Sequence, residues 1–346
     1  MQRSRGGAAI LLVLALAGCA GSREVPSNRI SSPASAPPTW SPTAMSSTAI
    51  PTTGTLAAIP PSSSATVFTT MPPAARMPAA AAPAHTGASC GNGRSPGTVV
   101  LTLPGGRTAL FAVPAGDDGH HRLGVVIALP GYGQTSKELA AQSRIPTRAM
   151  AAGVLAVLPQ GAGSAMSWNF SGTTGYDDRS FLSALIARLT DAECADPARI
   201  VIAGLSDGGD MAALAACALP GRFRALATVA ASTEPQRGCR PIRVVAIHGD
   251  ADPLDPYRGG PDARPGYPAT PPAVAGIAQW AALDGCTTAT IHRIAPQVAT
   301  TTYACGAQLV TINGGGHTWP GGAPVRASLG ITSGEYDATA TILGLL

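Results

Sequence analysis

Short apolar runs recur along the chain after residue 120, and each has the length of one buried β-strand. Because these runs carry no alternating polar positions, they are typical of parallel strands that are covered on both faces. The runs are Val125–Leu129, Val154–Leu158, Ile200–Ala203, Leu226–Ala230 and Val244–Ile247. Just before them, Thr98–Leu103 and Thr108–Val113 flank the turn sequence Pro104-Gly105-Gly106-Arg107, which predicts a hairpin.

Helical periodicity appears between the apolar runs. The segment from Asp177 to Thr190 places Phe181, Leu182, Leu185, Ile186 and Leu189 on one face, and further helical stretches cover Met211–Leu219, Pro272–Leu283 and Glu335–Leu346. Strands that alternate with helices after an antiparallel start predict an α/β fold: a mostly parallel central sheet with helices on both faces. Functional groups in such sheets gather at the carboxyl ends of the strands.

The first 88 residues follow a different pattern. Residues 1–19 combine two arginines, a short apolar core and the sequence Leu16-Ala17-Gly18-Cys19, which predicts an export signal too short to span a membrane. The last four residues resemble a bacterial lipobox, so Cys19 is the expected lipid anchor to the membrane; the alternative is ordinary signal cleavage nearby. Residues 20–88 are rich in Pro, Ser, Thr and Ala and predict a disordered linker. Residues 89–346 predict one catalytic domain, exported as an envelope lipoprotein or an extracellular protein.

Charge and cysteine content narrow the functional classes. The net charge of +4 comes almost wholly from scattered arginines, so nucleic-acid binding is not expected. Separately, we expect the protein to be a monomer. Six cysteines besides Cys19 allow up to three disulfides, whose pairing the sequence leaves open. Cys286 and Cys305 are the favoured pair, because they bracket a short predicted strand, Thr290–Ile294. The six are Cys90, Cys194, Cys217, Cys239, Cys286 and Cys305. They lack the C-x-x-C spacing of zinc sites, and we expect no metal or other cofactor.

A candidate nucleophile follows the third of the apolar runs. Gly204-Leu205-Ser206-Asp207-Gly208 lies between this strand and a predicted helix. Such a strained turn raises the serine Oγ above the sheet, and its flanking positions require glycine. Because the chain contains 41 glycines, the five-residue motif alone is weak evidence for a nucleophile. The predicted strand before it and the predicted helix after it strengthen the assignment. The pattern indicates an acyl hydrolase.

A serine nucleophile needs a histidine to accept its proton, and His317 is the best candidate. It follows three glycines, which we expect to leave the loop free to swing the side chain over the sheet. The other histidines lie in the linker, upstream of the serine or within strands; His248 ends a buried strand, where a structural hydrogen bond is expected. They are His85, His120, His121, His248 and His292.

The carboxylate that orients the histidine is expected between Ser206 and His317 in the chain. Asp252 fits best, since Asp250 and Asp255 are compatible with turn or surface positions. A calcium site made of these three carboxylates is a weak alternative, because the glycine and distal glutamate of a calcium loop are missing.

The oxyanion of the reaction needs two backbone donors. The amide of Asp207, next to the serine, is one, and the loop after Leu129 supplies the other. Pro130 has no N–H, so Tyr132 is the expected donor, with Gly131 and Gly133 allowing close approach of the backbone.

These residues together resemble the polyhydroxybutyrate depolymerase-like esterases of the α/β-hydrolase superfamily, a group that includes feruloyl and acetylxylan esterases. The resemblance runs from about Cys90 to the C-terminus and is carried by Leu129-Pro130-Gly131-Tyr132-Gly133, Trp168-Asn169, Asp177-Asp178, the serine turn, His248-Gly249-Asp250-Ala251-Asp252-Pro253, Trp280, Gly285-Cys286 and Gly315-Gly316-His317-Thr318-Trp319-Pro320-Gly321. It implies a triad of Ser206, Asp252 and His317 and an oxyanion hole of Tyr132 and Asp207. Two positions depart from the group: Pro130 replaces its usual histidine, and Asp207 replaces a small or amide residue.

The expected activity is that of a secreted, lipid-anchored serine esterase acting on feruloyl, acetyl or hydroxyalkanoate esters, with soluble or short-chain esters favoured over solid polymer. Trp168 and Trp319 are candidates for substrate binding, with core packing as the alternative, which we favour for Trp280. Other hypotheses are an envelope acyltransferase that uses the same triad and a catalytically weak binding lipoprotein.

Overall fold

The computed structural model describes residues 90–91, 93–262 and 267–346. The predicted signal peptide, Cys19 and the linker over 20–88 lie outside these ranges. In the part described, no helix is both long enough and apolar enough to span a bilayer.

The described residues form a ten-stranded sheet with the order β1-β2-β4-β3-β5-β6-β7-β10-β9-β8. Neighbouring strands are parallel from β4 to β10 and antiparallel at both edges. The strands are β1 (Gly97–Thr102), β2 (Thr108–Val113), β3 (Leu123–Leu129), β4 (Leu155–Pro159), β5 (Ala195–Leu205), β6 (Ala225–Val229), β7 (Arg243–Gly249), β8 (Ala289–Ala295), β9 (Val298–Tyr303) and β10 (Gln308–Ile312). The predicted α/β architecture with its antiparallel start is confirmed.

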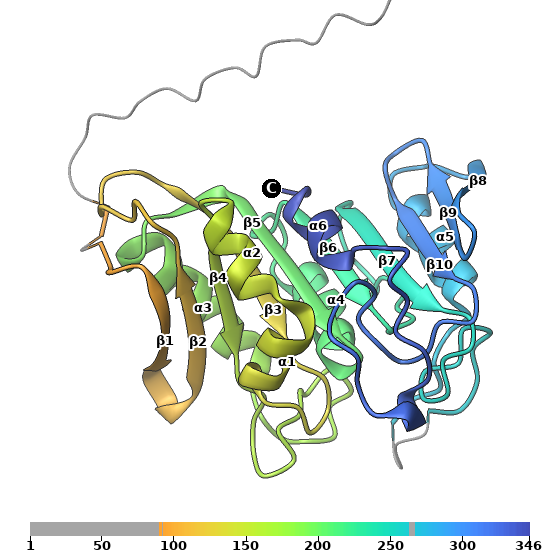
Figure 1. Cartoon of the computed structure of the whole chain (residues 1–346), viewed down its shortest axis with the longest axis horizontal. Coiled ribbons are helices and arrows are strands. Elements are labelled where there is room, and N and C mark those ends of the chain that lie inside the picture. The colour runs from red at the N-terminus through yellow and green to blue at the C-terminus, as the bar shows by residue number, and fades with distance from the viewer. Residues whose placement is uncertain (1–89, 92, 263–266) are drawn as a thin grey trace, which may run out of the picture. The chain divides into compact units, whose positions relative to one another are not determined.

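Helices cover both faces of this sheet (Figure 1). Along β3, Val125, Ile127 and Leu129 belong to the same core as residues of α3, α4 and α5, whereas Val126 and Ala128 belong to a second core with residues of α1, α2 and α6. Apolar residues at every position therefore fill two cores, as a strand inside a parallel sheet requires. The helices are α1 (Ser136–Ser143), α2 (Ile145–Ala151), α3 (Asp178–Ala192), α4 (Asp207–Ala218), α5 (Ala273–Ala282) and α6 (Ala338–Leu343), with short 3₁₀ turns η1 (Pro104–Gly106) and η2 (Ala327–Leu329).

The C-terminal third differs most from the prediction. The sequence predicts one strand at Thr290–Ile294, but the structure has a β8–β9 hairpin followed by β10, which pairs with β7 in parallel. Strand β9 has the sequence VATTTY, and its threonines leave no continuous apolar run of the kind that predicts the central strands. Strand β10 places the histidine loop next to the loop after β7, and this brings the two parts of the site together.

Two disulfides join distant parts of the domain, Cys90 to Cys194 and Cys217 to Cys239. The favoured pairing of Cys286 with Cys305 is wrong in this structure, because both remain thiols. They are nevertheless neighbours: the N–H of Cys286 and the Sγ of Cys305 both donate to the carbonyl oxygen of Ala281. Hydrogen bonding with Cys305 raises the pKa of the Cys286 thiol above its ordinary value.

Candidate active site

Ser206 occupies a sharp turn between β5 and α4. Its φ and ψ are 54° and −125°, a conformation that residues with a side chain rarely adopt. A β-carbon on Gly204 would lie 2.1 Å from the carbonyl oxygen of Gly208, and one on Gly208 would lie 2.2 Å from that of Leu129. Both glycines are therefore required. This is the strand-to-helix geometry of a nucleophile elbow.

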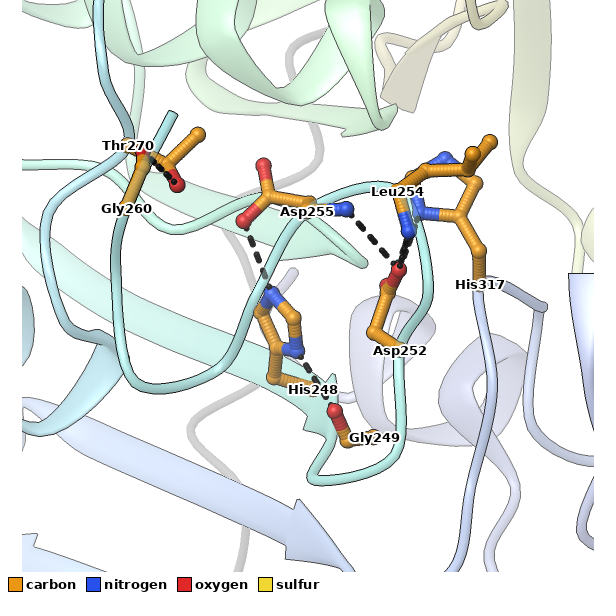
Figure 2. Close-up of polar contacts among 8 residues, drawn as sticks. All are labelled: His248, Gly249, Asp252, Leu254, Asp255, Gly260, Thr270 and His317. Carbon is orange, nitrogen blue, oxygen red and sulfur yellow. Dashed lines mark hydrogen bonds and ion pairs between the residues drawn. The ribbon is translucent and has the colours of Figure 1, made fainter. Parts of the chain in front are cut away.

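His317 and Asp252 form a buried pair in the loops that follow β10 and β7. The Nδ1 of His317 donates to Asp252 at 2.8 Å (Oδ2) and 3.0 Å (Oδ1). The N–H groups of Leu254 and Asp255 donate to the same Oδ1 at 2.8 and 2.9 Å (Figure 2). Because an ionised carboxylate only accepts, its contact keeps the proton on Nδ1 and leaves Nε2 of His317 as the acceptor.

The loop that carries His317 is held firmly, contrary to the expectation that its glycines let it swing. The N–H of His317 donates to the carbonyl oxygen of Leu329 at 2.6 Å. A β-carbon on Gly316 would lie 2.1 Å from that oxygen, and one on Gly249 would lie 2.2 Å from the carbonyl oxygen of Gly315. These glycines permit close backbone contacts, and the contacts fix the position of the imidazole.

The two carboxylates near Asp252 have partners of their own. Asp250 accepts from the N–H of Gly314 at 2.6 Å, and the Oδ1 of Asp255 lies 3.2 Å from the Nε2 of His248. The Nδ1 of His248 donates to the carbonyl oxygen of Gly249 at 3.0 Å, so its predicted structural hydrogen bonding is confirmed (Figure 2). Burial alone would lower the pKa of His248, but the hydrogen bond and charge of Asp255 raise it. Asp250, Asp252 and Asp255 are not grouped as ligands of a metal ion would be, and no group of three such side chains occurs in the described part of the chain.

The loop after β3 offers one amide to the cleft. The N–H of Gly131 donates to the Oε1 of Gln134 at 3.0 Å, and that of Gly133 donates to the carbonyl oxygen of Ala165 at 3.1 Å. Between them, the N–H of Tyr132 makes no hydrogen bond with any residue in the described ranges. This is the amide that the sequence predicts as an oxyanion donor.

The side chain of Asp207, which departs from the resembled group, is directed toward the backbone of Trp168. It is fully buried, and its Oδ2 accepts from the N–H of Trp168 at 2.8 Å. The indole N–H of Trp168 in turn donates to the carbonyl oxygen of Pro130 at 2.9 Å. Asp207 therefore serves as a buried acceptor for a backbone amide.

Both tryptophans predicted to bind substrate lie in the core, which corrects that expectation. Trp168 and Trp319 are 0% exposed, and the indole N–H of Trp319 donates to the Oγ1 of Thr339 at 3.0 Å. Their positions near the candidate catalytic motifs in sequence do not bring their rings to the cleft surface. Trp280 is buried with its indole N–H 3.2 Å from the carbonyl oxygen of Thr233, so its predicted core role is confirmed.

Ser206 and His317 open into one cleft of about 760 Å³, which Tyr132 also lines. The cleft has an apolar part formed by Leu205, Leu254, Ala323, Pro324, Val325 and Leu329 and a polar part that includes Gln134, Glu138 and Gln142. No sequence pattern predicts the segment 323–329 as part of the site. It has no strand or helix periodicity, and only its place between His317 and the last helix could have indicated it.

Proteins similar to this chain include esterases. No protein-family model matches the chain. A putative esterase, NocK, of Nocardia uniformis subsp. tsuyamanensis is 29% identical over 252 residues, which cover 64% of this chain and 73% of that protein. Feruloyl esterase B of Piromyces equi is 29% identical over 235 residues, but these cover only 42% of that protein.

A solved structure shares the fold. An acetyl xylan esterase from Aspergillus awamori superimposes with a TM-score of 0.52 at 17% identity, over 72% of this chain and 99% of its own. The fold is that of an α/β-hydrolase, and the sequence relatives support a carboxylic ester hydrolase as the class of enzyme.

Proposed function

We propose that the protein hydrolyses carboxylic esters with Ser206 as nucleophile, His317 as general base and acid, and Asp252 as the residue that orients His317. The observation that carries this proposal is one arrangement. The buried Asp252–His317 pair opens into the same cleft as a serine held in a strained turn. A strained turn or a buried carboxylate–imidazole pair alone can serve a purely structural role. Together they supply a nucleophile, a base and a group that fixes the tautomer of the base.

The proposed reaction passes through an acyl-enzyme. The Oγ of Ser206 attacks the ester carbonyl carbon while the Nε2 of His317 takes its proton, and the amides of Tyr132 and Asp207 bind the oxygen that becomes negative. The His317 imidazolium then protonates the departing alcohol. Water then attacks the acyl carbon while the Nε2 of His317 takes its proton, and His317 returns this proton to the Oγ of Ser206 as the acyl–oxygen bond breaks and the acid leaves.

The substrate we propose is a soluble ester whose acid part is larger than acetate. A cleft of about 760 Å³ with an apolar wall gains binding free energy from an apolar acyl group, which acetate scarcely provides. A feruloyl-type or short hydroxyalkanoate ester fits this description. The similarity to a feruloyl esterase points in the same direction.

Active-site labelling and turnover test the proposal together. The purified protein should react with a fluorophosphonate probe and hydrolyse nitrophenyl esters, and Ser206→Ala should abolish both. Labelling and turnover that persist in Ser206→Ala would disprove the assignment. Product analysis with and without a sugar acceptor separates hydrolysis from acyl transfer. A panel of acetyl, hydroxybutyryl and feruloyl esters then identifies the acid.

We also propose that the enzyme is exported and attached to the membrane through a lipid on Cys19. The signal sequence and the residues before Cys19 support this, and the two disulfides are typical of oxidising compartments outside the cytoplasm. The full-length protein expressed in a bacterium should enter the detergent phase of a Triton X-114 extraction. Cys19→Ser should move to the aqueous phase with its esterase activity intact; equal partitioning of both would contradict the anchor.

A further inference from the structure

Trp168 is hydrogen-bonded to both sides of the proposed oxyanion hole. Its backbone N–H donates to the Oδ2 of Asp207, and its indole N–H donates to the carbonyl oxygen of Pro130. Asp207 follows the proposed nucleophile, and Pro130 precedes the proposed donor Tyr132 by two residues. Trp168 and Asp207 are both 0% exposed, so neither side chain touches substrate. One buried residue thus links the serine turn to the loop after β3.

The contacts in this loop determine the direction of the Tyr132 N–H. The carbonyl of Pro130 and the N–H of Gly131 belong to one peptide group, and they are held by the indole of Trp168 and by Gln134 Oε1. In the next peptide group, the carbonyl of Gly131 accepts from the N–H of Gln134 at 3.1 Å. Because the C=O and N–H of a trans peptide point in opposite directions, fixing the Gly131 carbonyl fixes the Tyr132 N–H.

Close packing connects the loop to the start of α4. A β-carbon on Gly208 would lie 2.4 Å from the carbonyl oxygen of Pro130. The first turn of α4 therefore lies directly against the peptide group that Trp168 holds. A shift of Pro130 would change the distance between the amides of Tyr132 and Asp207, which must both reach one oxygen atom.

Trp168 is itself held from the other side. The N–H of Asn169 donates to the Oδ2 of Asp178 at 2.7 Å, and Asp178 forms an ion pair with Arg107, whose guanidinium lies 5.0 Å from the Trp168 ring centre. Two consecutive amides, those of Trp168 and Asn169, are therefore bound by two buried carboxylates. This explains how the segment can act as a rigid support.

We infer that Asp207 and Trp168 are positioning residues, whose contact sets the geometry of the oxyanion hole. The inference rests on the proposed function. It assigns a use to the carboxylate that departs from the resembled esterases: a buried acceptor on the α4 side of the hole, which holds Trp168 and through it the Tyr132 amide. Their loss should reduce binding of the transition state more than binding of the substrate.

The test compares Asp207→Ala, Asp207→Asn and Trp168→Phe with wild type. Misplaced catalytic groups typically cost up to about 100-fold in rate, so we expect Asp207→Ala and Trp168→Phe to lower kcat by about 10- to 100-fold while KM changes by less than about threefold. Asparagine keeps an oxygen that can accept from Trp168, so Asp207→Asn should recover at least half of the loss on a logarithmic scale. Trp280→Phe is the matched control, because it also removes an indole contact with a carbonyl oxygen, that of Thr233.

Inhibition by a trifluoromethyl ketone, which forms a tetrahedral oxyanion on the serine, supplies a second measurement. Its affinity should fall in parallel with kcat in Asp207→Ala and Trp168→Phe and stay near wild type in Trp280→Phe. If wild type hydrolyses esters but the two variants keep their kcat, or lose kcat and inhibitor affinity no more than Trp280→Phe does, the positioning role is wrong and the esterase assignment stands. If wild type neither hydrolyses esters nor labels with fluorophosphonate, the proposed function fails and the positioning role with it.

Discussion

Asp255 connects to Asp252 through its backbone, while its side chain binds a different histidine. Its N–H donates to Asp252 Oδ1 at 2.9 Å, and its own Oδ1 lies 3.2 Å from the Nε2 of His248. Two carboxylate–imidazole pairs are thus joined through one backbone amide. The His317 pair opens into the cleft, whereas His248 is almost fully buried.

The buried His248 pair should make stability depend on pH. The folded-state pKa of His248 lies above its ordinary value, so protonated His248 favours the folded state. This contribution is complete below about pH 6.5, the unfolded pKa, and is lost as the pH rises through the folded pKa. The difference in Tm between wild type and His248→Gln should therefore be larger at pH 6 than at pH 9. His292→Gln, on the exposed strand β8, is the control. A His248 difference that stays constant with pH would contradict the prediction.

Asp252→Asn should reduce kcat sharply without loss of folding. The amide can donate to Nδ1 and so favour the tautomer in which Nε2 carries the proton and cannot accept one from Ser206. A loss of about 10³- to 10⁴-fold in kcat is expected from comparable triads. The measurement is the turnover of a nitrophenyl ester with circular dichroism to confirm folding.

Asp250→Asn is the matched control for Asp252→Asn. Asp250 is two residues away. Among the described residues its side chain accepts a hydrogen bond from the N–H of Gly314 and makes none with His317. Its kcat should stay within a few-fold of wild type. Equal losses in the two variants would show that Asp252 has no special relation to His317.

Sequence patterns predict the centre of the fold because burial on both faces produces continuous apolar runs. Strand β5 and the turn at Ser206 are of this kind, since the close contact that requires Gly204 is with Gly208, only four residues further along the chain. The pairing of β10 with β7 is not local. The threonines of β9 interrupt the apolar run that would otherwise predict this strand. The chain order of a serine, an aspartate and a histidine predicts the candidate residues, but not the contact between Asp252 and His317, which depends on that pairing.

The tryptophans illustrate a second limit of sequence reasoning. Trp168 and Trp319 lie near the proposed catalytic residues in space or sequence, yet both indoles are fully buried. The sequence does not show whether an aromatic ring beside a motif packs into the core or lines a pocket. Asp207 shows the same limit. The sequence identifies it as unusual, but its role as an acceptor depends on a contact with Trp168, which lies 39 positions away in the chain.

Leu254 should influence which acyl groups are accepted. Its side chain is 38% exposed in the cleft, and its N–H binds Asp252. Leu254→Ala removes apolar surface but keeps the N–H, so kcat/KM should fall by about 5- to 50-fold for a feruloyl or hexanoyl ester and much less for an acetyl ester. Ile291→Ala, an exposed apolar change on β8, is the control. A loss of kcat/KM that is equal for all the esters would show that Leu254 does not contact the acyl group.

The cysteines give a prediction that does not depend on catalysis. Iodoacetamide added to the denatured, unreduced protein should modify Cys286 and Cys305, whereas the four bonded cysteines should react only after reduction. Peptide mass spectrometry distinguishes the sites. An unmodified Cys286–Cys305 pair would mean that the two neighbouring thiols have oxidised to a third disulfide.

The two disulfides should also differ in their contribution to stability. Cys90–Cys194 closes a loop with a sequence separation of 104, against 22 for Cys217–Cys239. A cross-link stabilises a protein by restricting its unfolded chain, and the restriction grows with the logarithm of loop length. Replacing both members of the first pair by serine should therefore lower the free energy of unfolding by about 1.4 kcal/mol more than the same change in the second pair. Urea unfolding of the two double variants measures this difference, and a larger loss for the short loop would mean that native contacts outweigh chain entropy here.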